Sequence, residues 1–284
     1  MSVLSESLAD LIRRAATELP PDIVGALRRA QGAEAEGSPA CAALATLLEN
    51  DAVAREGSVP ACQDTGTPTF WFDLPDGTPV LPIREAVREA VAVATAAGHL
   101  RLNVIEVPSG RQVSSNFAPG SPAIHFRFGP AGSVPRATLL LKGGGSENQS
   151  RQYSLPDDGL GAGRDLEGVR RCALDAVWRA QGGGCAPGVL GVCIGGDRAG
   201  AYACAKEQLL RPLDDASPDP ALADLERRLL EEANALGIGP MGLGGRTTLL
   251  GVKIAALPRV PASYFVTIAY GCWACRRVSA PLPL

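Results

Sequence analysis

Glycine-rich turns constrain the fold of this chain more than any other feature of its sequence. They lie at residues 143–145, 182–184, 195–196 and 237–245. Turns of this kind mark the ends of helices and strands. The segments between them have helical and strand-like patterns that interleave without a regular order. We therefore expect a mixed α/β (α+β) fold in which helices flank β-sheets.

Hydrophobic periodicity locates the individual elements. Apolar residues at helical spacing predict helices at 3–17, 84–98, 166–181, 199–211 and 220–236. Apolar or alternating runs predict strands at 70–74, 123–128, 137–142, 189–194, 249–256 and 264–270. Asp219 and Pro220 suit the N-cap and first turn of the last helix. We expect one domain over residues 1–284, with a weak boundary between two lobes near the polar, turn-rich stretch 151–166.

The composition excludes several classes of function. A net charge of −3 gives no basic surface for nucleic acid, and 5% aromatic residues offer few platforms for base stacking. No apolar run reaches the length of about 18 residues that a membrane helix needs. Acidic residues and arginines interrupt the first twenty residues, which therefore do not resemble a signal peptide. We expect a cytoplasmic protein with no nucleic-acid or membrane partner.

The glycine-rich turns do not match nucleotide-binding motifs. In KGGGS (142–146) the lysine precedes the glycines, which is the wrong order for a phosphate-binding loop. GGDRAG (195–200) follows an apolar strand but lacks the GxGxxG spacing. We interpret it as a tight turn from a strand to a helix.

Three of the eight cysteines have unusual neighbours. Cys62, Cys185 and Cys272 lie in polar or glycine-rich loops beside predicted strands, where functional ligands tend to be placed. Backbone N–H groups in such loops stabilise a thiolate. Three cysteines from distant loops would suit an iron–sulfur cluster in which one iron has no protein ligand and can bind substrate.

Other interpretations of the cysteines remain open at this point. Cys272 and Cys275 form a CxxC pair, which occurs in redox proteins and as half of a zinc site. No second pair follows at zinc spacing, and the only histidines are His99 and His125. The remaining cysteines suit a buried, apolar role in a cytosolic chain, where disulfides are rare.

Six sequence blocks resemble the class I, iron–sulfur-dependent fumarate hydratases and the L(+)-tartrate dehydratases. The resemblance keeps its order across nearly the whole chain. The blocks are PACQDTGT (60–67), NFAPGSPAIHF (116–126), LLLKGGGSENQS (139–150), CAPGVLGVCIGGDR (185–198), GIGPMGLGGRTTLLGVKI (237–254) and GCWACRR (271–277).

The resemblance implies a [4Fe–4S] cluster as cofactor. The matching cysteines are Cys62, Cys185 and Cys272, in loops at the ends of strands. Cys193 and Cys275 stand where the family places no ligand, so we interpret them as bystanders.

The resemblance also implies a set of substrate-binding and catalytic residues. Gln63 would hydrogen-bond the substrate, and Asp64 would join the acid/base network. Arg101 matches a clamp for a substrate carboxylate, which a guanidinium can bind through two donors. The glycine turn resembles a backbone contact to substrate through Gly143, Gly144 or Gly145. The alternatives are a solvated surface charge for Arg101 and a turn cap for Asp64.

The expected reaction is the reversible hydration of fumarate to L-malate. The single-chain members of the family continue beyond the region matched here, whereas this sequence ends at Leu284. It therefore resembles an alpha subunit, and we expect a separate beta subunit that completes the active site in a hetero-oligomer. KGGGSEN (142–148) resembles the fumarate hydratase form of the motif.

Three alternatives to a fumarate hydratase stay open. The first is an L(+)-tartrate dehydratase alpha subunit, which would act on a related small dicarboxylate. The second is a non-catalytic iron–sulfur redox or sensor protein. The third is a partner subunit that has lost its chemistry.

Overall fold

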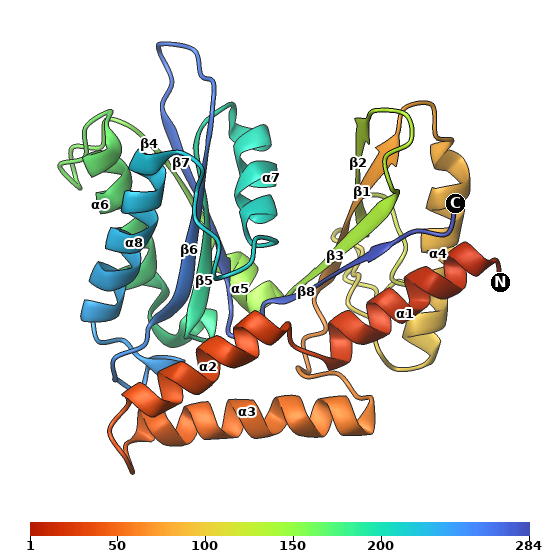
Figure 1. Cartoon of the computed structure of the whole chain (residues 1–284), viewed down its shortest axis with the longest axis horizontal. Coiled ribbons are helices and arrows are strands. Elements are labelled where there is room, and N and C mark those ends of the chain that lie inside the picture. The colour runs from red at the N-terminus through yellow and green to blue at the C-terminus, as the bar shows by residue number, and fades with distance from the viewer. The chain divides into compact units, whose positions relative to one another are not determined.

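The computed structural model describes all residues, 1–284, and they form two compact units. Unit 1 comprises Met1–Pro20, Glu49–Gly144 and Arg276–Leu284, and unit 2 comprises Pro21–Leu48 and Gly145–Cys275. Each unit contains a four-stranded sheet with both parallel and antiparallel pairs, covered by helices (Figure 1). The predicted mixed α/β fold is therefore confirmed. Compact units need not be independent domains, so the single domain with two lobes stays a prediction.

The sheet of unit 1 has the strand order β2-β1-β3-β8. Strand β1 runs parallel to β2 and antiparallel to β3, which pairs antiparallel with β8. Two helices, α1 and α4, share the hydrophobic core with this sheet. The bounds are α1 Val3–Thr17, β1 Thr67–Pro75, α4 Val80–Ala96, β2 Ala123–Gly129, β3 Arg136–Lys142 and β8 Arg276–Pro281.

Side-chain alternation decides which face of this sheet is covered. Phe70 and Phe72 of β1 lie in one buried cluster with Leu139 and Leu141 of β3 and the apolar stripes of α1 and α4. Successive residues of a strand point to opposite faces, so Trp71 lies on the other side, where it stacks on His125. The period of two in the sequence therefore places both helices on a single face.

The sheet of unit 2 has the order β4-β7-β5-β6, with only the β5–β6 pair parallel. Helices α6 and α8 lie on one face and α7 on the other (Figure 1). The bounds are β4 Arg151–Ser154, α6 Leu166–Ala180, β5 Gly188–Gly195, α7 Arg198–Gln208, α8 Pro220–Ala235, β6 Leu249–Leu257 and β7 Phe265–Gly271. The other elements are α2 Pro21–Ala33, α3 Pro39–Gly57, α5 Gly144–Asn148 and two short 3₁₀ helices, Gln181–Gly184 and Pro240–Gly242.

Strand β5 is buried on both faces, which explains its uninterrupted apolar sequence. Leu190 and Val192 join the core beneath α6 and α8. Gly191 faces α7 so closely that a Cβ there would lie 2.1 Å from the Ala205 carbonyl oxygen. A strand covered on both sides holds the loops at its two ends in fixed positions.

All the predicted helices and strands are present, with ends shifted by a few residues. Asp219 caps α8, since its carboxylate accepts from the backbone N–H groups of Ala221 (2.8 Å) and Leu222 (3.2 Å). Asp197 caps α7 in the same way, so the 195–200 segment is the predicted strand-to-helix turn. None of the helices combines the length and the apolar character that crossing a membrane requires.

The sequence analysis does not predict α2, α3, α5, β4 or β8, and local reasons account for this. Helix α2 contains two glycines, which lower helix propensity, and the alanines of α3 spread around the helix without one clear apolar face. Strand β8 begins with Arg276 and Arg277, charged residues that hide its burial in the sequence. Strand β4 and helix α5 are too short to show a period.

Candidate active site

The loop before β1 fixes the Asp64 carboxylate through two backbone donors. Its Oδ1 accepts a hydrogen bond from the Gly66 N–H at 3.0 Å, and its Oδ2 accepts one from the Gly144 N–H at 2.7 Å. Hydrogen bonds to an ionised acceptor are short and strong. The carboxylate is therefore held in one orientation while keeping lone pairs for other partners.

Strand pairing brings the two loops together. Thr67 pairs with Lys142 at the end of the antiparallel β1–β3 ladder, so Asp64 and Gly144 meet just beyond it. Gly66 turns the chain with φ +80°, and a Cβ there would lie 2.8–2.9 Å from backbone atoms of Lys142. Only glycine accommodates both the left-handed conformation and this close approach.

A second loop, residues 101–103, is hydrogen-bonded to the first. The Thr65 hydroxyl oxygen accepts from the Arg101 N–H (3.2 Å) and from the Asn103 side-chain amide (3.1 Å). The Arg101 guanidinium donates to the Gln63 carbonyl at 3.1 Å. Asn116, only 3% exposed, donates to the Arg101 carbonyl (2.8 Å) and accepts from the Asn103 N–H (2.9 Å). These contacts hold Arg101 against the loop that carries Asp64.

The Asp64 loop, the 101–103 loop and the glycine turn line a polar cavity of about 460 Å³. Asp64 supplies its only carboxylate and Arg101 its only positive charge. The lining residues are Gln63, Asp64, Gly66, Thr67, Arg101, Asn103 and Gly144. An arginine and an amide beside a fixed carboxylate suit the binding of a small anion and the movement of a proton.

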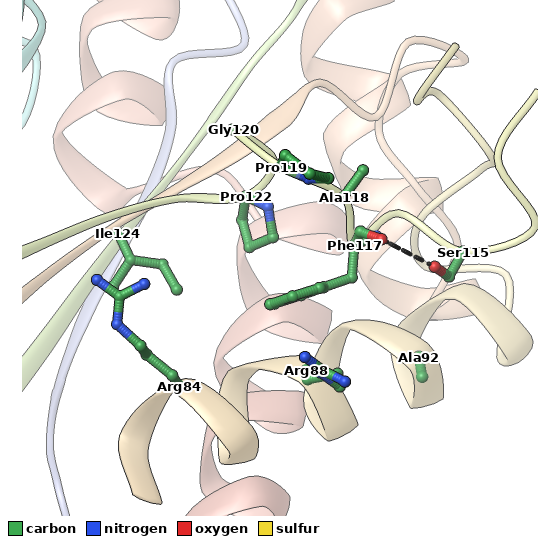
Figure 2. Close-up of a pocket in the computed structure, with 10 residues that line it drawn as sticks. All are labelled: Arg84, Arg88, Ala92, Ser115, Phe117, Ala118, Pro119, Gly120, Pro122 and Ile124. Atoms are coloured by element: carbon green, nitrogen blue, oxygen red, sulfur yellow. Dashed lines mark hydrogen bonds between the residues drawn. The ribbon is translucent and has the colours of Figure 1, made fainter. Parts of the chain in front are cut away.

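A larger cavity of about 670 Å³ lies elsewhere in unit 1 (Figure 2). Arg84 and Arg88 of α4 border it, and each guanidinium stacks on a phenylalanine ring, Phe126 at 5.4 Å and Phe117 at 4.8 Å. The hydroxyl of Ser115 donates to the Phe117 carbonyl. No lining side chain is a carboxylate, histidine or thiol that could accept a proton. The smaller cavity therefore suits proton-transfer chemistry better.

The buried Arg276 side chain is hydrogen-bonded to the Asp64 loop. It is 1% exposed, and its Nη2 donates to the Asp64 carbonyl at 2.8 Å. Its Nε and Nη1 have no hydrogen-bond partner. A buried guanidinium is costly unless its donors are satisfied. The burial of the Arg276 guanidinium next to the Asp64 carbonyl therefore indicates that Arg276 helps to hold the Asp64 loop.

Two of the predicted cysteine loops are adjacent in unit 2. Cys185 is exposed and follows the 3₁₀ helix Gln181–Gly184 in a left-handed conformation, with φ +54°. Cys272 follows β7 and is partly exposed. The Trp273 N–H donates to the Cys185 carbonyl at 3.1 Å, which joins the two loops. Both thiols are therefore carried by one small, hydrogen-bonded region of the surface.

A buried tyrosine lies beside these two thiols. Tyr270 is 0% exposed, and its hydroxyl has no hydrogen-bond partner. Burial raises the pKa of Tyr270, and the Cys272 and Cys185 thiols raise it further, so the hydroxyl keeps its proton. An unsatisfied donor next to two accessible cysteines fits a site that gains a sulfur acceptor when a thiolate-bound metal group is present.

The third predicted ligand, Cys62, belongs to unit 1 and directly precedes Gln63 and Asp64. Within neither unit do three cysteine, histidine or acidic side chains form a group that could hold a metal ion. The three-cysteine ligand set therefore stays a prediction. Cys193 and Cys275 are buried, and the Cys275 thiol contacts the Leu209 carbonyl at 3.7 Å. Their role as bystanders stays a prediction.

The chain's sequence places it among known proteins. The profile of the family described as "Fumarate hydratase (Fumerase)" matches residues 5–281. The chain belongs to the fumarate hydratase family. This agrees with the resemblance of the six sequence blocks.

Individual members of the fumarate hydratase family match over almost the whole chain. A protein from Geobacillus stearothermophilus named as a class I fumarate hydratase is 47% identical over 281 residues, which are 98% of this chain and 54% of that protein. The chain thus spans about half the length of that relative.

Two further members are named as alpha subunits of L(+)-tartrate dehydratase. The one from Methanocaldococcus jannaschii is 36% identical over 281 residues, 96% of this chain and 95% of that protein. The one from Escherichia coli (strain K12) is 30% identical over 276 residues, 96% of this chain and 89% of that protein.

The structure brings together most of the unit 1 residues that the fumarate hydratase resemblance predicts. Gln63, Asp64, Arg101 and Gly144 line one cavity. A Cβ on Gly143 would lie 3.0 Å from the Asp64 carboxylate, whereas Gly145 lies in α5 with open space around it. Their roles toward a substrate stay predictions.

Sequence reasoning missed several residues that support the site. Asn116 begins a block already noted, and an amide directly before the apolar Phe117 and Ala118 is a signal that could have identified it. Arg276 lies in GCWACRR, where the charge of the pair obscured its burial. Nothing in the sequence marks the hydroxyl of Tyr270, because its lack of a partner is visible only after folding.

Proposed function

We propose that this chain is the cluster-carrying alpha subunit of a hydro-lyase that converts fumarate and L-malate into each other. One observation carries this proposal. The Asp64 carboxylate is fixed by two backbone N–H groups at a cavity that it shares with Arg101. Membership of the fumarate hydratase family supports the same reaction type.

The cavity residues have separate tasks in this reaction. Arg101 binds a substrate carboxylate, and its charge stabilises the negative charge that develops when the adjacent carbon loses a proton. Gln63 hydrogen-bonds the substrate and limits its orientations. Asp64 takes part in proton transfer, since the Gly66 and Gly144 N–H groups hold its carboxylate in place.

Cys62, Cys185 and Cys272 would hold a [4Fe–4S] cluster. When bound, such a cluster supplies an iron without a protein ligand, which acts as a Lewis acid on a substrate carboxylate and hydroxyl. The two accessible thiols of unit 2 and the unpaired Tyr270 hydroxyl support this assignment.

A separate beta subunit would complete the active site and assemble with this chain in a hetero-oligomer. Two relatives that this chain covers almost completely are named as alpha subunits. The purified chain alone should therefore bind a cluster and show little turnover, and addition of the beta subunit should restore activity. Full turnover by the chain alone would refute this part of the proposal.

Iron and acid-labile sulfide analysis of anaerobically purified protein tests the cluster assignment. We expect Cys62→Ser, Cys185→Ser and Cys272→Ser each to lose iron, sulfide and the visible absorption of the cluster. Cys193→Ser and Cys275→Ser are the matched controls and should retain all three. If the cluster is lost with the control substitutions instead, the ligand assignment is wrong.

L(+)-tartrate dehydration is the second candidate, because two relatives carry that name. The two reactions differ by one hydroxyl on the substrate, and a site discriminates strongly only if it hydrogen-bonds that group. We expect kcat/KM of the two-subunit enzyme to favour fumarate and L-malate over L-tartrate. A tenfold preference for tartrate, about 1.4 kcal/mol in transition-state binding, would overturn this choice.

A further inference from the structure

Tyr270 is held rigidly beside the two cysteine loops of unit 2. Its backbone N–H donates to the Ser150 hydroxyl at 3.2 Å. A Cβ on Gly184 would lie 2.3 Å from the tyrosine ring, and one on Gly188 would lie 2.6 Å from the hydroxyl oxygen. The two glycines flank the Cys185 turn, so they form a slot that fixes the hydroxyl next to that turn.

The Tyr270 hydroxyl makes no visible contribution to the stability of the protein. It is fully buried and makes no hydrogen bond to any protein atom. Leaving a buried hydroxyl unsatisfied costs about 1–3 kcal/mol, and phenylalanine would fill the same slot without that cost. A tyrosine here therefore indicates an acceptor that arrives with a bound group.

The nearby chemistry limits what this acceptor can be. The Tyr270 ring lies against Gly184, the residue directly before Cys185, and Cys272 follows Tyr270 by two residues in the chain. Metal-bound thiolates and cluster sulfides accept hydrogen bonds, and such bonds tune iron–sulfur groups. Ligands around metal sites are commonly supported by a donor of this kind.

We propose that the Tyr270 hydroxyl donates a hydrogen bond to a sulfur of the iron–sulfur group held by Cys185 and Cys272, and thereby slows loss of that group. Tyr270 is a positioning residue in this role, since it touches a ligand sulfur and not the substrate. The inference rests on the proposed cluster.

The test compares Tyr270→Phe with Tyr153→Phe. Tyr153 lies on β4 of the same sheet, and its hydroxyl donates to Asp175 at 2.8 Å. The control therefore loses a hydroxyl that has a protein partner, at a site away from the cysteine loops. Each protein is purified anaerobically, its iron and sulfide are measured, and the visible absorption is followed after exposure to air with a chelator.

We expect opposite effects from the two substitutions. Tyr270→Phe should bind iron and sulfide, keep or raise its unfolding temperature without cluster, and bleach about two- to tenfold faster, the range that one ordinary hydrogen bond accounts for. Tyr153→Phe should lower the unfolding temperature and bleach at the wild-type rate.

Two results would overturn the inference in distinguishable ways. Equal bleaching of Tyr270→Phe and wild-type protein, with normal iron and sulfide in both, refutes the role of the hydroxyl and leaves the proposed function intact. Absence of iron and sulfide from the anaerobic wild-type protein refutes the proposed cluster and the inference with it.

Discussion

Replacement of Gly66 by alanine tests whether the Asp64 loop depends on close packing against the glycine turn. Gly66 has φ +80°, and a Cβ there would lie 2.8 Å from the carbonyl carbon, 2.9 Å from the nitrogen and 2.9 Å from the oxygen of Lys142. These are backbone atoms of β3, which cannot rotate away as a flexible side chain would. The substitution must therefore shift the loop or the strand.

Two terms contribute to the expected loss of stability. A left-handed backbone costs a non-glycine residue about 1–2 kcal/mol. Forcing an extra carbon into a packed region costs about 1–3 kcal/mol. Gly66→Ala should therefore lower the free energy of unfolding by about 2–5 kcal/mol.

Gly77 provides a matched control at the other end of β1. Its φ is +82°, and an added Cβ would meet nothing within 4 Å. Gly77→Ala should therefore incur only the backbone term of about 1–2 kcal/mol. The difference between the two variants isolates the clash with Lys142.

Urea denaturation followed by the fluorescence of Trp71 measures both variants. Trp71 is buried in β1 of unit 1, and replacing Trp178 and Trp273 by phenylalanine makes it the only reporter. Equal losses of stability in Gly66→Ala and Gly77→Ala would refute the reasoning. A shift of the Gly66 N–H should also release the Asp64 carboxylate and reduce kcat of the two-subunit enzyme.

The remaining predictions concern the chemistry of the site. Asp64→Asn places an amide near the Gly144 N–H, and we expect kcat to fall by about 10²-fold or more if Asp64 moves a proton; kcat within a factor of three of wild type would contradict that role. Arg101→Met should reduce kcat/KM by about 10–100-fold through loss of a charged hydrogen bond, with partial recovery in Arg101→Lys, and an unchanged kcat/KM would mark Arg101 as a surface charge. Activity should decline on aerated incubation with a chelator, and activity that survives such treatment would exclude an accessible iron.

The sequence alone determined where most helices and strands lie, because periodicity arises from burial of one face of each element. It also determined the family, since six ordered blocks are far more specific than any one motif. Asp64, Gln63 and Arg101 were identified as neighbours in function from those blocks. Charge and glycine content hid β8 and α2, where tertiary packing overrides the local preference of the chain.

Only the tertiary structure decided how the site is built. Asp64 and Gly144 are 80 residues apart, and the β1–β3 register brings the Asp64 Oδ2 atom within 2.7 Å of the Gly144 backbone nitrogen. Asn116 likewise holds the Arg101 loop in place through a hydrogen bond to the Arg101 carbonyl, a contact that no local sequence pattern encodes. Folding likewise buries the Tyr270 hydroxyl at a place where no protein atom accepts its hydrogen bond. Such properties belong to the surroundings of a residue, which the chain acquires only when distant segments pack together.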